Sequence, residues 1–542
     1  MLLPLGKLRN YEERANLIIF LICEKEANMS EEKKVVQVTE EPQELKRGIK
    51  GWQVAFIGLG GVIGSCYFLG VGWCIQAMGP AVFLAFGVVG VIVYGLMIAY
   101  AELLVNLPRK GSFVAYTNEF LGETMSVGMG WSFWFNWVCY VPSEAIAVSY
   151  VLQSLTGNKS AIAYVAFAVG ALAALTIINL CAVDIFAKIE SGLAITKVCV
   201  IILFALLAFG IWVGLWGNPQ GVVQGAVEDG FKGMGVNFGD ADFMADLFPN
   251  GFAIVLTCMV VVLVTFQGTE IVGLAAAESQ DPDKSVPRAC KSVTYRIVGL
   301  YLVPILLVLL VYPTDLGTDE TPIFADIMKA YGMGPFGFIM SAVVLVAAFS
   351  CANTGFYGTV RCMYGLAVEG LAPKFLGKLN KKATPKNAVL FTLLFMWIVL
   401  IIGLVSELTG TLSNLYTNLL SMSGFTGTLA WVGIIASQKR FRVRIKQRGY
   451  DPDTCLRARV SKGQSWVPWF AMIAQLCCLL LMAFADPEIT GGGPIVFAVA
   501  CAAVIVPMIV QKITKSMGKT RVINSLGADE KTFDETFPDL TK

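Results

Sequence analysis

The chain has 542 residues, of which 56% are hydrophobic and 15% charged, and its formal net charge is +2. Soluble domains carry about 25% charged residues, so this composition indicates a membrane protein and leaves little chain for a soluble catalytic module. Histidine is absent, which excludes histidine-based catalysis, histidine metal ligands and a histidine proton relay.

Residues 1–50 are predicted to form a cytoplasmic N-terminal tail. An apolar run at 15–23 is too short to span a membrane and has no small-residue cleavage site, so it does not predict a signal peptide. Met29 opens a polar stretch typical of a tail. We interpret Met29 as the natural start and 1–28 as an upstream extension; a native chain that begins at Met1 on N-terminal sequencing would contradict this.

Spanning the hydrocarbon takes about 20 mostly apolar residues. By this criterion the sequence predicts twelve transmembrane helices, at 52–78, 81–105, 124–151, 161–183, 193–215, 251–276, 293–313, 336–360, 388–406, 412–436, 467–485 and 493–512. Basic residues concentrate in the connections after the even-numbered spans, and only Lys159, Lys232 and Lys329 lie in the opposite set. The positive-inside rule then predicts that both termini are cytoplasmic.

Spans 1 and 6 are both interrupted, at 60–65 and at 265–270. A bilayer offers no water to loose backbone groups, so a broken helix persists there only beside a cavity or buried in protein. Matched interruptions in two repeats indicate the substrate site of a transporter. Because span 6 comes five spans after span 1, and five is odd, the second repeat would be inverted in the membrane relative to the first.

The prediction is therefore an all-helical membrane protein built on a 5+5 inverted repeat. Its parts are the tail 1–50, a first repeat of helices 1–5 at 51–215, an extracellular loop at 216–250, a second repeat of helices 6–10 at 251–436, a basic cytoplasmic loop at 437–466, helices 11 and 12 at 467–512, and a cytoplasmic C-terminal tail at 513–542. The glycines and prolines of 216–250 predict an irregular loop. The basic cluster at 439–446 is interpreted as an anchor on anionic lipid rather than a nucleic-acid site.

Half-helix N-termini expose unpaired N–H groups and a partial positive charge, which suit a carboxylate. We expect the substrate carboxylate at the amides of Gly64, Ser65 and Cys66. The substrate ammonium is expected at carbonyls of the two interruptions. The predicted binding residues there are Gly61, Val62, Ile63, Phe266, Gln267, Gly268 and Thr269. The alternative for span 1 is that Gly60 and Gly64 form a helix-packing face.

Two carboxylates, Glu144 in span 3 and Glu270 in span 6, are predicted at membrane depth. An intramembrane ionisable group is costly and is a functional candidate by default, here for a cationic substrate side chain or a proton. The alternatives are that Glu270 only holds the broken helix and that Glu144 makes an interhelical hydrogen bond. Glu102 lies near the cytoplasmic end of span 2, where we expect it to be part of a gate or to have a role in helix packing.

Other polar or aromatic residues are assigned with less specific roles. Phe266 is expected to act as an aromatic gate over the substrate. Small polar residues in spans 8 and 10 are candidates for the transport pathway, or ordinary helix contacts: Ser350, Asn353, Ser421 and Ser423. The fourteen cysteines show no metal-ligand spacing and are interpreted as small apolar residues. No metal and no cofactor is predicted.

Several motifs, in order along about 50–515, resemble amino acid permeases of the amino acid–polyamine–organocation superfamily. They are Leu-Gly-Gly-Val-Ile-Gly-Ser at 59–65, Gly-Ser-Phe at 111–113, Gly-Trp-Ser-Phe-Trp-Phe-Asn-Trp at 130–137, Phe-Pro-Asn-Gly at 248–251, Phe-Gln-Gly-Thr-Glu at 266–270, Glu-Ser-Gln-Asp-Pro at 278–282, Asn-Thr-Gly at 353–355 and Ser-Gly-Phe-Thr-Gly at 423–427. The resemblance implies a LeuT-like fold and coupled amino acid transport. The motifs of spans 6 and 10 look most similar to permeases specific for lysine and basic amino acids.

One departure bears on the substrate. Permeases of this kind usually have Thr-Gly where this chain has Ser65-Cys66, so the carboxylate contact and the substrate size are open. Lys197 in span 5 stands where related proton-coupled permeases carry a lysine in place of a sodium ion. A desolvated lysine can exchange a proton during the cycle; the alternative is that Lys197 snorkels to the cytoplasmic surface.

The sequence is thus interpreted as a proton-coupled importer of a cationic amino acid, lysine or arginine, in the plasma membrane, working by alternating access. Alternatives are a broad-range or neutral amino acid permease, and a sodium symporter or exchanger. From another class, a non-transporting amino acid sensor could share the fold. The expected partners are the amino acid, a proton and the lipid bilayer. Neither an enzyme nor a nucleic-acid-binding protein is predicted.

Overall fold

We analysed a computed structural model of the chain, whose contacts divide it into a unit of residues 1–44 and a unit of residues 45–542. The structure describes residues 58, 61–109, 111–181, 186–228, 231, 233–234, 242–276, 282–318, 320–380, 384–411, 414–486, 492–517 and 531–541, all within the second unit. The predicted tail at 1–50, the question of its start and the glycine at position 60 lie outside the described residues.

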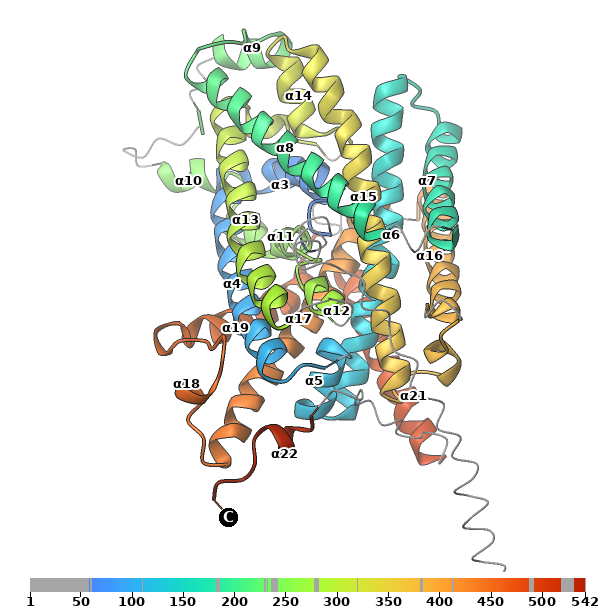
Figure 1. Cartoon of the computed structure of the whole chain (residues 1–542). Helices are drawn as coiled ribbons and strands as arrows, with labels where there is room; N and C mark the ends of the chain where they lie inside the picture. Colours follow the sequence, from blue (N-terminus) through green and yellow to red (C-terminus); the bar gives the residue numbers. More distant parts are fainter. Residues whose placement is uncertain are drawn as a thin grey trace, which may run out of the picture. The chain divides into compact units, whose positions relative to one another are not determined.

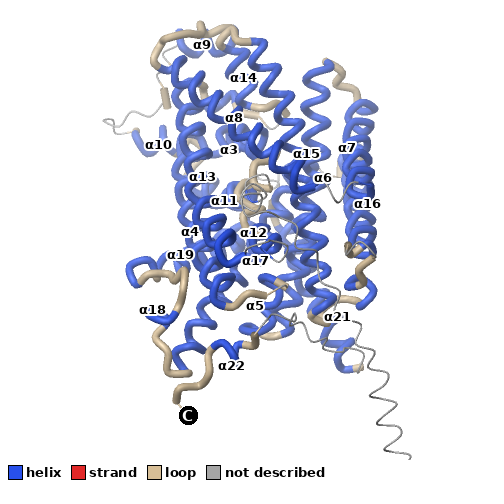
Figure 2. The backbone as a smooth tube through the Cα atoms, in the orientation of Figure 1, coloured by secondary structure: helices blue, strands red, loops and turns tan. Residues whose placement is uncertain are grey.

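Helices and turns make up the described chain, and no strand occurs in it (Figures 1 and 2). The longer helices are α4 (Val82–Asn106), α6 (Glu123–Thr156), α7 (Ala161–Cys181), α8 (Phe186–Trp212), α11 (Phe252–Val264), α13 (Pro282–Val311), α15 (Gly334–Val368), α16 (Lys386–Leu408), α17 (Leu415–Gln447), α19 (Trp466–Leu481) and α21 (Pro494–Ser516). Nine helical stretches within the described ranges are long and apolar enough to cross a membrane. The predicted total of twelve and the inverted repeat stay predictions.

Shorter elements connect or interrupt these helices. They are η2 (Cys66–Gly70), α3 (Val71–Met78), η3 (Gly79–Ala81), α5 (Ser112–Leu121), α9 (Gly221–Glu228), α10 (Phe243–Leu247), α12 (Ile271–Ala276), η5 (Thr314–Leu316), α14 (Ile323–Ala330), η6 (Lys374–Gly377), α18 (Pro452–Cys455), η7 (Lys462–Gln464), η8 (Met482–Phe484) and α22 (Phe533–Thr536). The first of them, η2, is one turn of π-helix, a feature often found at functional sites.

Large apolar side chains point outward from the peripheral helices. On α16, for example, Leu394 is 57% and Ile402 60% exposed. A water-facing surface rarely carries a contiguous apolar patch of this kind, whereas a lipid-facing one must, because lipid offers no partner to polar groups. The helices therefore have the surface of a multi-pass membrane protein.

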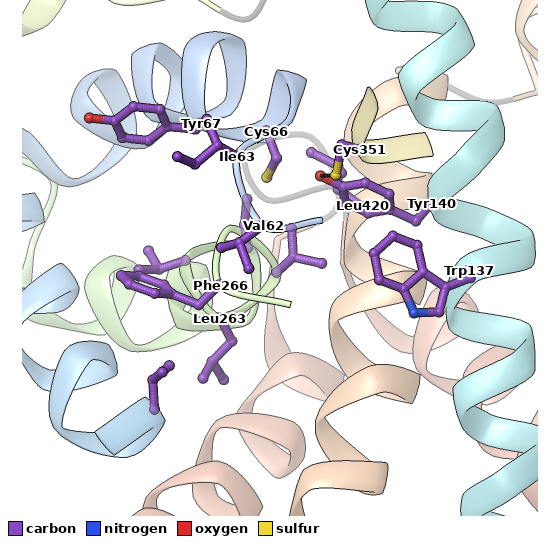
Figure 3. Packing of buried hydrophobic residues seen from close by; sticks show 14 of the residues in the cluster. Val62, Ile63, Cys66, Tyr67, Trp137, Tyr140, Leu263, Phe266, Cys351 and Leu420 are labelled. Carbon is purple, nitrogen blue, oxygen red and sulfur yellow. Dashed lines mark hydrogen bonds between the residues drawn. The ribbon is translucent and has the colours of Figure 1, made fainter. Parts of the chain in front are cut away.

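The core of the bundle forms where α6 packs along both α15 and α17 (Figure 1). The interrupted segments lie against these three helices. Figure 3 shows Val62 and Phe266, one from each interruption, within the same packed cluster as Trp137 and Tyr140 of α6. Both interruptions are therefore buried in protein, as the lack of water in a bilayer requires.

Three predicted boundaries differ from the structure. The predicted irregular loop at 216–250 contains the helices α9 and α10. Span 5, predicted from 193, begins at Phe186 as α8, because charged residues hid its first two turns from a hydropathy criterion. The basic stretch at 439–446 continues α17 instead of opening a loop. Phe441 and Ile445 are buried there, four residues apart on one helix face, and this packing sustains the helix beyond its apolar part.

Glu102 joins three parts of the bundle near the end that carries α5 and α18. Its Oε1 accepts hydrogen bonds from Arg442 Nε at 2.8 Å and Gln438 Nε2 at 2.7 Å. Its Oε2 accepts from the backbone N–H of Val460 at 2.7 Å. The side chain is fully buried and both its oxygens are bonded, so Glu102 has a packing role in this conformation.

The C-terminal segment 531–541 docks on the same end. Thr532 and Glu535 form a reciprocal capping box at the start of α22, and the hydrogen bond from the Thr532 backbone N–H, with that of its side chain, lowers the pKa of Glu535. Phe533 and Phe537 are buried against Phe441 of α17. This segment is therefore part of the folded molecule.

Its backbone and charged groups are bound as well. The Arg448 guanidinium donates to the Phe537 carbonyl at 2.7 Å and pairs with Asp534 at 2.5 Å. The Leu540 N–H donates to the Arg448 carbonyl at 3.0 Å. Arg109, which precedes α5, donates to the Lys531 carbonyl at 2.7 Å. The segment thus ties α17 to the region of α5.

Candidate functional site

The first break comprises residues 61–64, which form turns and bends before the helix resumes at Ser65. The Ser65 N–H lies 3.1 Å from both carboxylate oxygens of Glu144, which α6 supplies. A Cβ added at Gly64 would lie 2.3 Å from Glu144 Oε1, so only glycine allows this approach. The amide that we expected to bind a substrate carboxylate therefore binds a carboxylate of the protein itself.

The second break, residues 265–270, forms turns between α11 and α12. Its amide at Gly268 donates to both oxygens of Glu270, at 3.2 and 3.0 Å. Trp431 Nε1 on α17 donates to Glu270 Oε2 at 2.9 Å. Glu270 thus caps its own break, in keeping with the interpretation that it holds the broken helix.

The two breaks touch each other. Gly268 has φ +105°, and a Cβ there would lie 2.5 Å from the Gly61 carbonyl oxygen. The Tyr301 hydroxyl on α13 lies 2.7 Å from the Thr265 carbonyl and 3.2 Å from that of Val62, so one side chain bridges both breaks. The breaks therefore form one structural unit.

Carbonyls expected to bind the substrate ammonium also have internal donors. The Cys351 thiol on α15 donates to the Gly61 carbonyl at 3.0 Å. The Tyr301 hydroxyl lies 3.2 Å from the Val62 carbonyl. Phe266, the expected aromatic gate, is fully buried, and its ring stacks on Tyr301 with centroids 4.6 Å apart. In this conformation Val62, Phe266 and Cys351 belong to the packed core (Figure 3).

Polar groups of α17, from its backbone and its side chains, contact both breaks. Gln267 donates to the Gly424 carbonyl at 3.2 Å, and Ser423, which also contacts Asn136 of α6, lies 3.4 Å from Gln267 Oε1. The Ser65 and Tyr416 hydroxyls are 3.1 Å apart. Thr269 is buried within the second break, and Ser421 is buried on α17.

Lys197 on α8 is fully buried by protein, which disfavours snorkelling toward the membrane surface. Its strongest electrostatic neighbours are Glu190 on the same helix, Cys351 on α15 and Glu144 on α6. Of the expected pathway residues on α15, Ser350 donates to Glu190 Oε1 at 2.5 Å. Asn353 accepts from Asn179 of α7 at 2.9 Å.

Glu144 also borders a small crevice between α6, α7 and α15. Apolar residues, among them Leu172 and Ala348, form the rest of its described lining. The crevice has a volume of about 20 Å³, room for about one water molecule. The carboxylate thus has the Ser65 amide on one side and this space on another.

Sequence reasoning missed Glu190, because the predicted start of span 5 left it outside the membrane. It also missed Tyr301, Tyr416 and Cys351, which look like ordinary members of apolar segments. Trp431 of span 10 was assigned no role. The feature that could have identified these four residues is a hydroxyl, thiol or indole donor in a span that packs against a break.

The whole arrangement lies within a recognisable family domain. Residues 53–523 match the family model described as amino acid permease. The chain belongs to the amino acid permease family. Because the match covers both breaks and every helix from η2 to α21, this permease is a multi-pass membrane transporter of the amino acid–polyamine–organocation superfamily.

Three relatives illustrate the similarity. The permease is 30% identical over 422 residues to the lysine-specific permease LysP of Escherichia coli, covering 76% of this chain and 82% of LysP. It is 34% identical to the amino-acid permease RocC of Bacillus subtilis, covering 75% and 83% of the two chains. It is 31% identical to an L-asparagine permease of Salmonella typhimurium, covering 80% and 83%. The relatives are permeases, which are transporters rather than enzymes.

Proposed function

We propose that this permease takes up a cationic amino acid, lysine or arginine, together with a proton, across the plasma membrane. The observation that best supports this function is the contact between the Glu144 carboxylate and the Ser65 amide, together with the buried Lys197 ammonium that interacts with Glu144. Buried carboxylates at a transporter midplane attract a cationic side chain. The similarity to the lysine-specific permease of Escherichia coli agrees with this substrate class.

In the proposed cycle, Glu144 and the substrate carboxylate compete for one amide. A substrate carboxylate that binds the Ser65 N–H must displace the Glu144 carboxylate, because that single donor serves both Glu144 oxygens in this conformation. The displaced Glu144 is then free to pair with the substrate's cationic group. The internal carboxylate thus occupies the site in the empty transporter and becomes a ligand in the loaded one.

The proposal includes a LeuT-like arrangement of twelve spans, with two inverted repeats that rock around the breaks and both termini in the cytoplasm. Lys197 is the proposed proton-exchanging group, because its charge, buried beside Glu190 and Glu144, stands where a coupling cation would be needed. Lys197→Ala is expected to abolish the proton dependence of uptake. Measuring uptake at several imposed pH gradients checks this; a mutant that keeps wild-type proton dependence contradicts the role.

A neutral substrate is the second candidate, favoured by the 31% identity to an L-asparagine permease. The need for the Glu144 charge distinguishes a neutral substrate from a cationic one. A neutral substrate needs no counter-charge, so Glu144→Gln would leave its uptake nearly intact, whereas a cationic substrate would lose most of its uptake.

The direct test is uptake of radiolabelled lysine into proteoliposomes under an inward proton gradient in sodium-free buffer. Competition by the other unlabelled amino acids gives the specificity. Gradient-driven uptake blocked by lysine and arginine supports the proposal. Uptake of another amino acid instead would keep the mechanism and overturn the cationic specificity. Sodium-stimulated uptake would overturn proton coupling, and binding without transport would indicate a sensor.

A further inference from the structure

Another buried carboxylate, Glu190 of α8, lies outside both breaks and has no role in the cycle described so far. It is fully buried, and its Oε1 accepts a hydrogen bond from Ser350 of α15. Its Oε2 has no hydrogen-bond partner in the structure, and neither has the buried Thr354 Oγ1, one turn along α15 from Ser350. Buried polar atoms without partners are rare enough in folded proteins to require an explanation.

One hydrogen bond between these two atoms would pair both of them, and it can form in either protonation state of Glu190, because the Thr354 hydroxyl can donate or accept. An ionised carboxylate can only accept hydrogen bonds, whereas a neutral carboxyl group has one O–H donor. Both Ser350 and Thr354 act on the Glu190 carboxyl group. With the proton on Oε2, Glu190 would donate to Thr354 Oγ1 while Oε1 still accepts from Ser350. The site is thus shaped for the protonated acid as well as for the ionised one.

The charges around Glu190 favour an exchangeable proton. Lys197 follows Glu190 by seven residues, two turns along the same helix face, and Lys197 also interacts with Glu144 of α6 and Cys351 of α15. Tyr301 of α13, the other helix packed against α8, bonds the breaks instead. Two carboxylates thus share one ammonium group. A buried cluster carrying net charge is costly, so one added proton would make this one neutral.

We propose that Glu190 is the positioning carboxylate of the coupling site and that the Glu190–Lys197 pair exchanges one proton as a unit. When Glu190 is ionised, it holds the Lys197 ammonium beside α15. When Glu190 takes up a proton, it bonds Thr354 and releases Lys197, whose ammonium draws Glu144 away from the Ser65 amide until the substrate's cationic group takes its place beside Glu144. When the site opens to the other side, Glu190 returns the proton to water. This inference rests on the proposed proton coupling.

The two hydroxyl groups on α15 make the test directional. Ser350 donates to Glu190, and a hydrogen bond to an ionised acceptor is the stronger one, so Ser350→Ala should weaken the ionised state more than the protonated state. Thr354 can donate to the ionised carboxylate and accept from the protonated one, so Thr354→Val, like Ser350→Ala, should weaken the ionised state more. Both changes should move the pH midpoint of uptake up, each by about 0.5–1 pH unit.

The experiment measures uptake against external pH for the wild type and for Ser350→Ala, Thr354→Val and Glu190→Gln, using the amino acid that the wild type transports fastest in a screen of twenty. Glu190→Gln, which can donate to Thr354 permanently, should flatten the profile to less than about a twofold change between pH 5 and 8, since no proton is exchanged there. Glu407→Gln is the matched control. Glu407 contacts Tyr164 and the Leu415 N–H at the opposite end of the bundle, and its loss should leave the midpoint unchanged.

Upward shifts for both hydroxyl variants, with a flat Glu190→Gln profile, would support the inference. Should all three variants keep the wild-type midpoint while uptake stays proton-driven, Glu190 is structural and the proposed function survives. A wild type without proton dependence would remove both the proposed coupling and this inference. If Glu190→Gln does not fold, the two hydroxyl variants decide the question, because each removes only one small polar group.

Discussion

Both breaks have a backbone N–H that needs a hydrogen-bond acceptor, and a different part of the chain supplies that acceptor in each. Each has a backbone N–H that bonds both oxygens of a carboxylate, at Ser65 in the first and at Gly268 in the second. The first carboxylate comes from α6, 79 residues away in sequence. The second comes from the break itself, two residues on, and a tryptophan from α17 fixes it.

This difference separates a removable cap from a permanent one. Glu144 can leave the first break through a side-chain rotation, without any change in the chain that it caps. Glu270 cannot leave the second break without giving up the Trp431 bond as well as the Gly268 bond. We therefore propose ligand exchange at the first break and structural support at the second.

The largest expected effect follows from the contact between the breaks. Gly268→Ala would put a Cβ 2.5 Å from the Gly61 carbonyl oxygen and would strain a residue with φ +105°. Backbone strain of this kind costs on the order of 1–3 kcal/mol, and the overlap adds to it. We expect loss of uptake and a clear fall in apparent melting temperature, measured by thermal shift in detergent.

Gly122→Ala is the control for that prediction. Gly122 has φ +92° and nothing within 4 Å of the added Cβ, so it carries the strain without the overlap. The difference between the two variants therefore measures the contact between the breaks. Equal effects of the two substitutions would show that the breaks do not depend on each other.

The next effect concerns the removable cap. Glu144→Gln keeps an oxygen that can accept from Ser65 but removes the charge. We expect lysine uptake to fall by about 100-fold, equivalent to about 2.7 kcal/mol, because the proposed counter-charge is lost. Apparent melting temperature should change little. Uptake assays and thermal shift on the same sample check both parts; a variant that transports lysine normally would remove Glu144 from the site.

Replacing Glu270, the cap of the second break, should lower stability more than it affects uptake. In Glu270→Gln, an amide oxygen at the position of Oε2 would still accept from Gly268 and Trp431, but both hydrogen bonds would lose the charge that strengthens them. Loss of charge-assisted hydrogen bonds costs about 1.5–3 kcal/mol. We expect a lower apparent melting temperature, with the substrate concentration for half-maximal uptake nearly unchanged. A large change in that concentration with unaltered stability would reverse our assignment of the two breaks.

The smallest effect is expected for the bridging tyrosine. Tyr301→Phe keeps the ring stacked on Phe266 but removes the hydroxyl shared by the two breaks, at a cost of about 1 kcal/mol. The uptake rate should fall by a few fold. Tyr67→Phe is the control, because the Tyr67 hydroxyl donates to the Leu300 carbonyl and to neither break. Similar losses in both variants would mean that bridging has no special role.

The two breaks and the carboxylates that bond to them, Glu144 and Glu270, could be located from the sequence, because small and polar residues inside an apolar run are visible without a structure. The sequence could not identify the partner of the Ser65 amide, since that contact joins segments 79 residues apart. Glu190 was missed for a local reason: charges near the start of α8 lowered the hydropathy that marks a span. The extension of α17 was missed in the same way, because its buried face shows only two apolar residues among many charges.

The docked C-terminal segment has a consequence for any protein that would recognise it as a linear motif. Phe533 and Phe537 are covered by α17, and Leu540 is bonded to Arg448. A binding partner would have to compete with an intramolecular host whose effective concentration is on the order of millimolar. Affinities measured with a synthetic peptide of residues 531–541 would therefore overstate the binding of the intact chain.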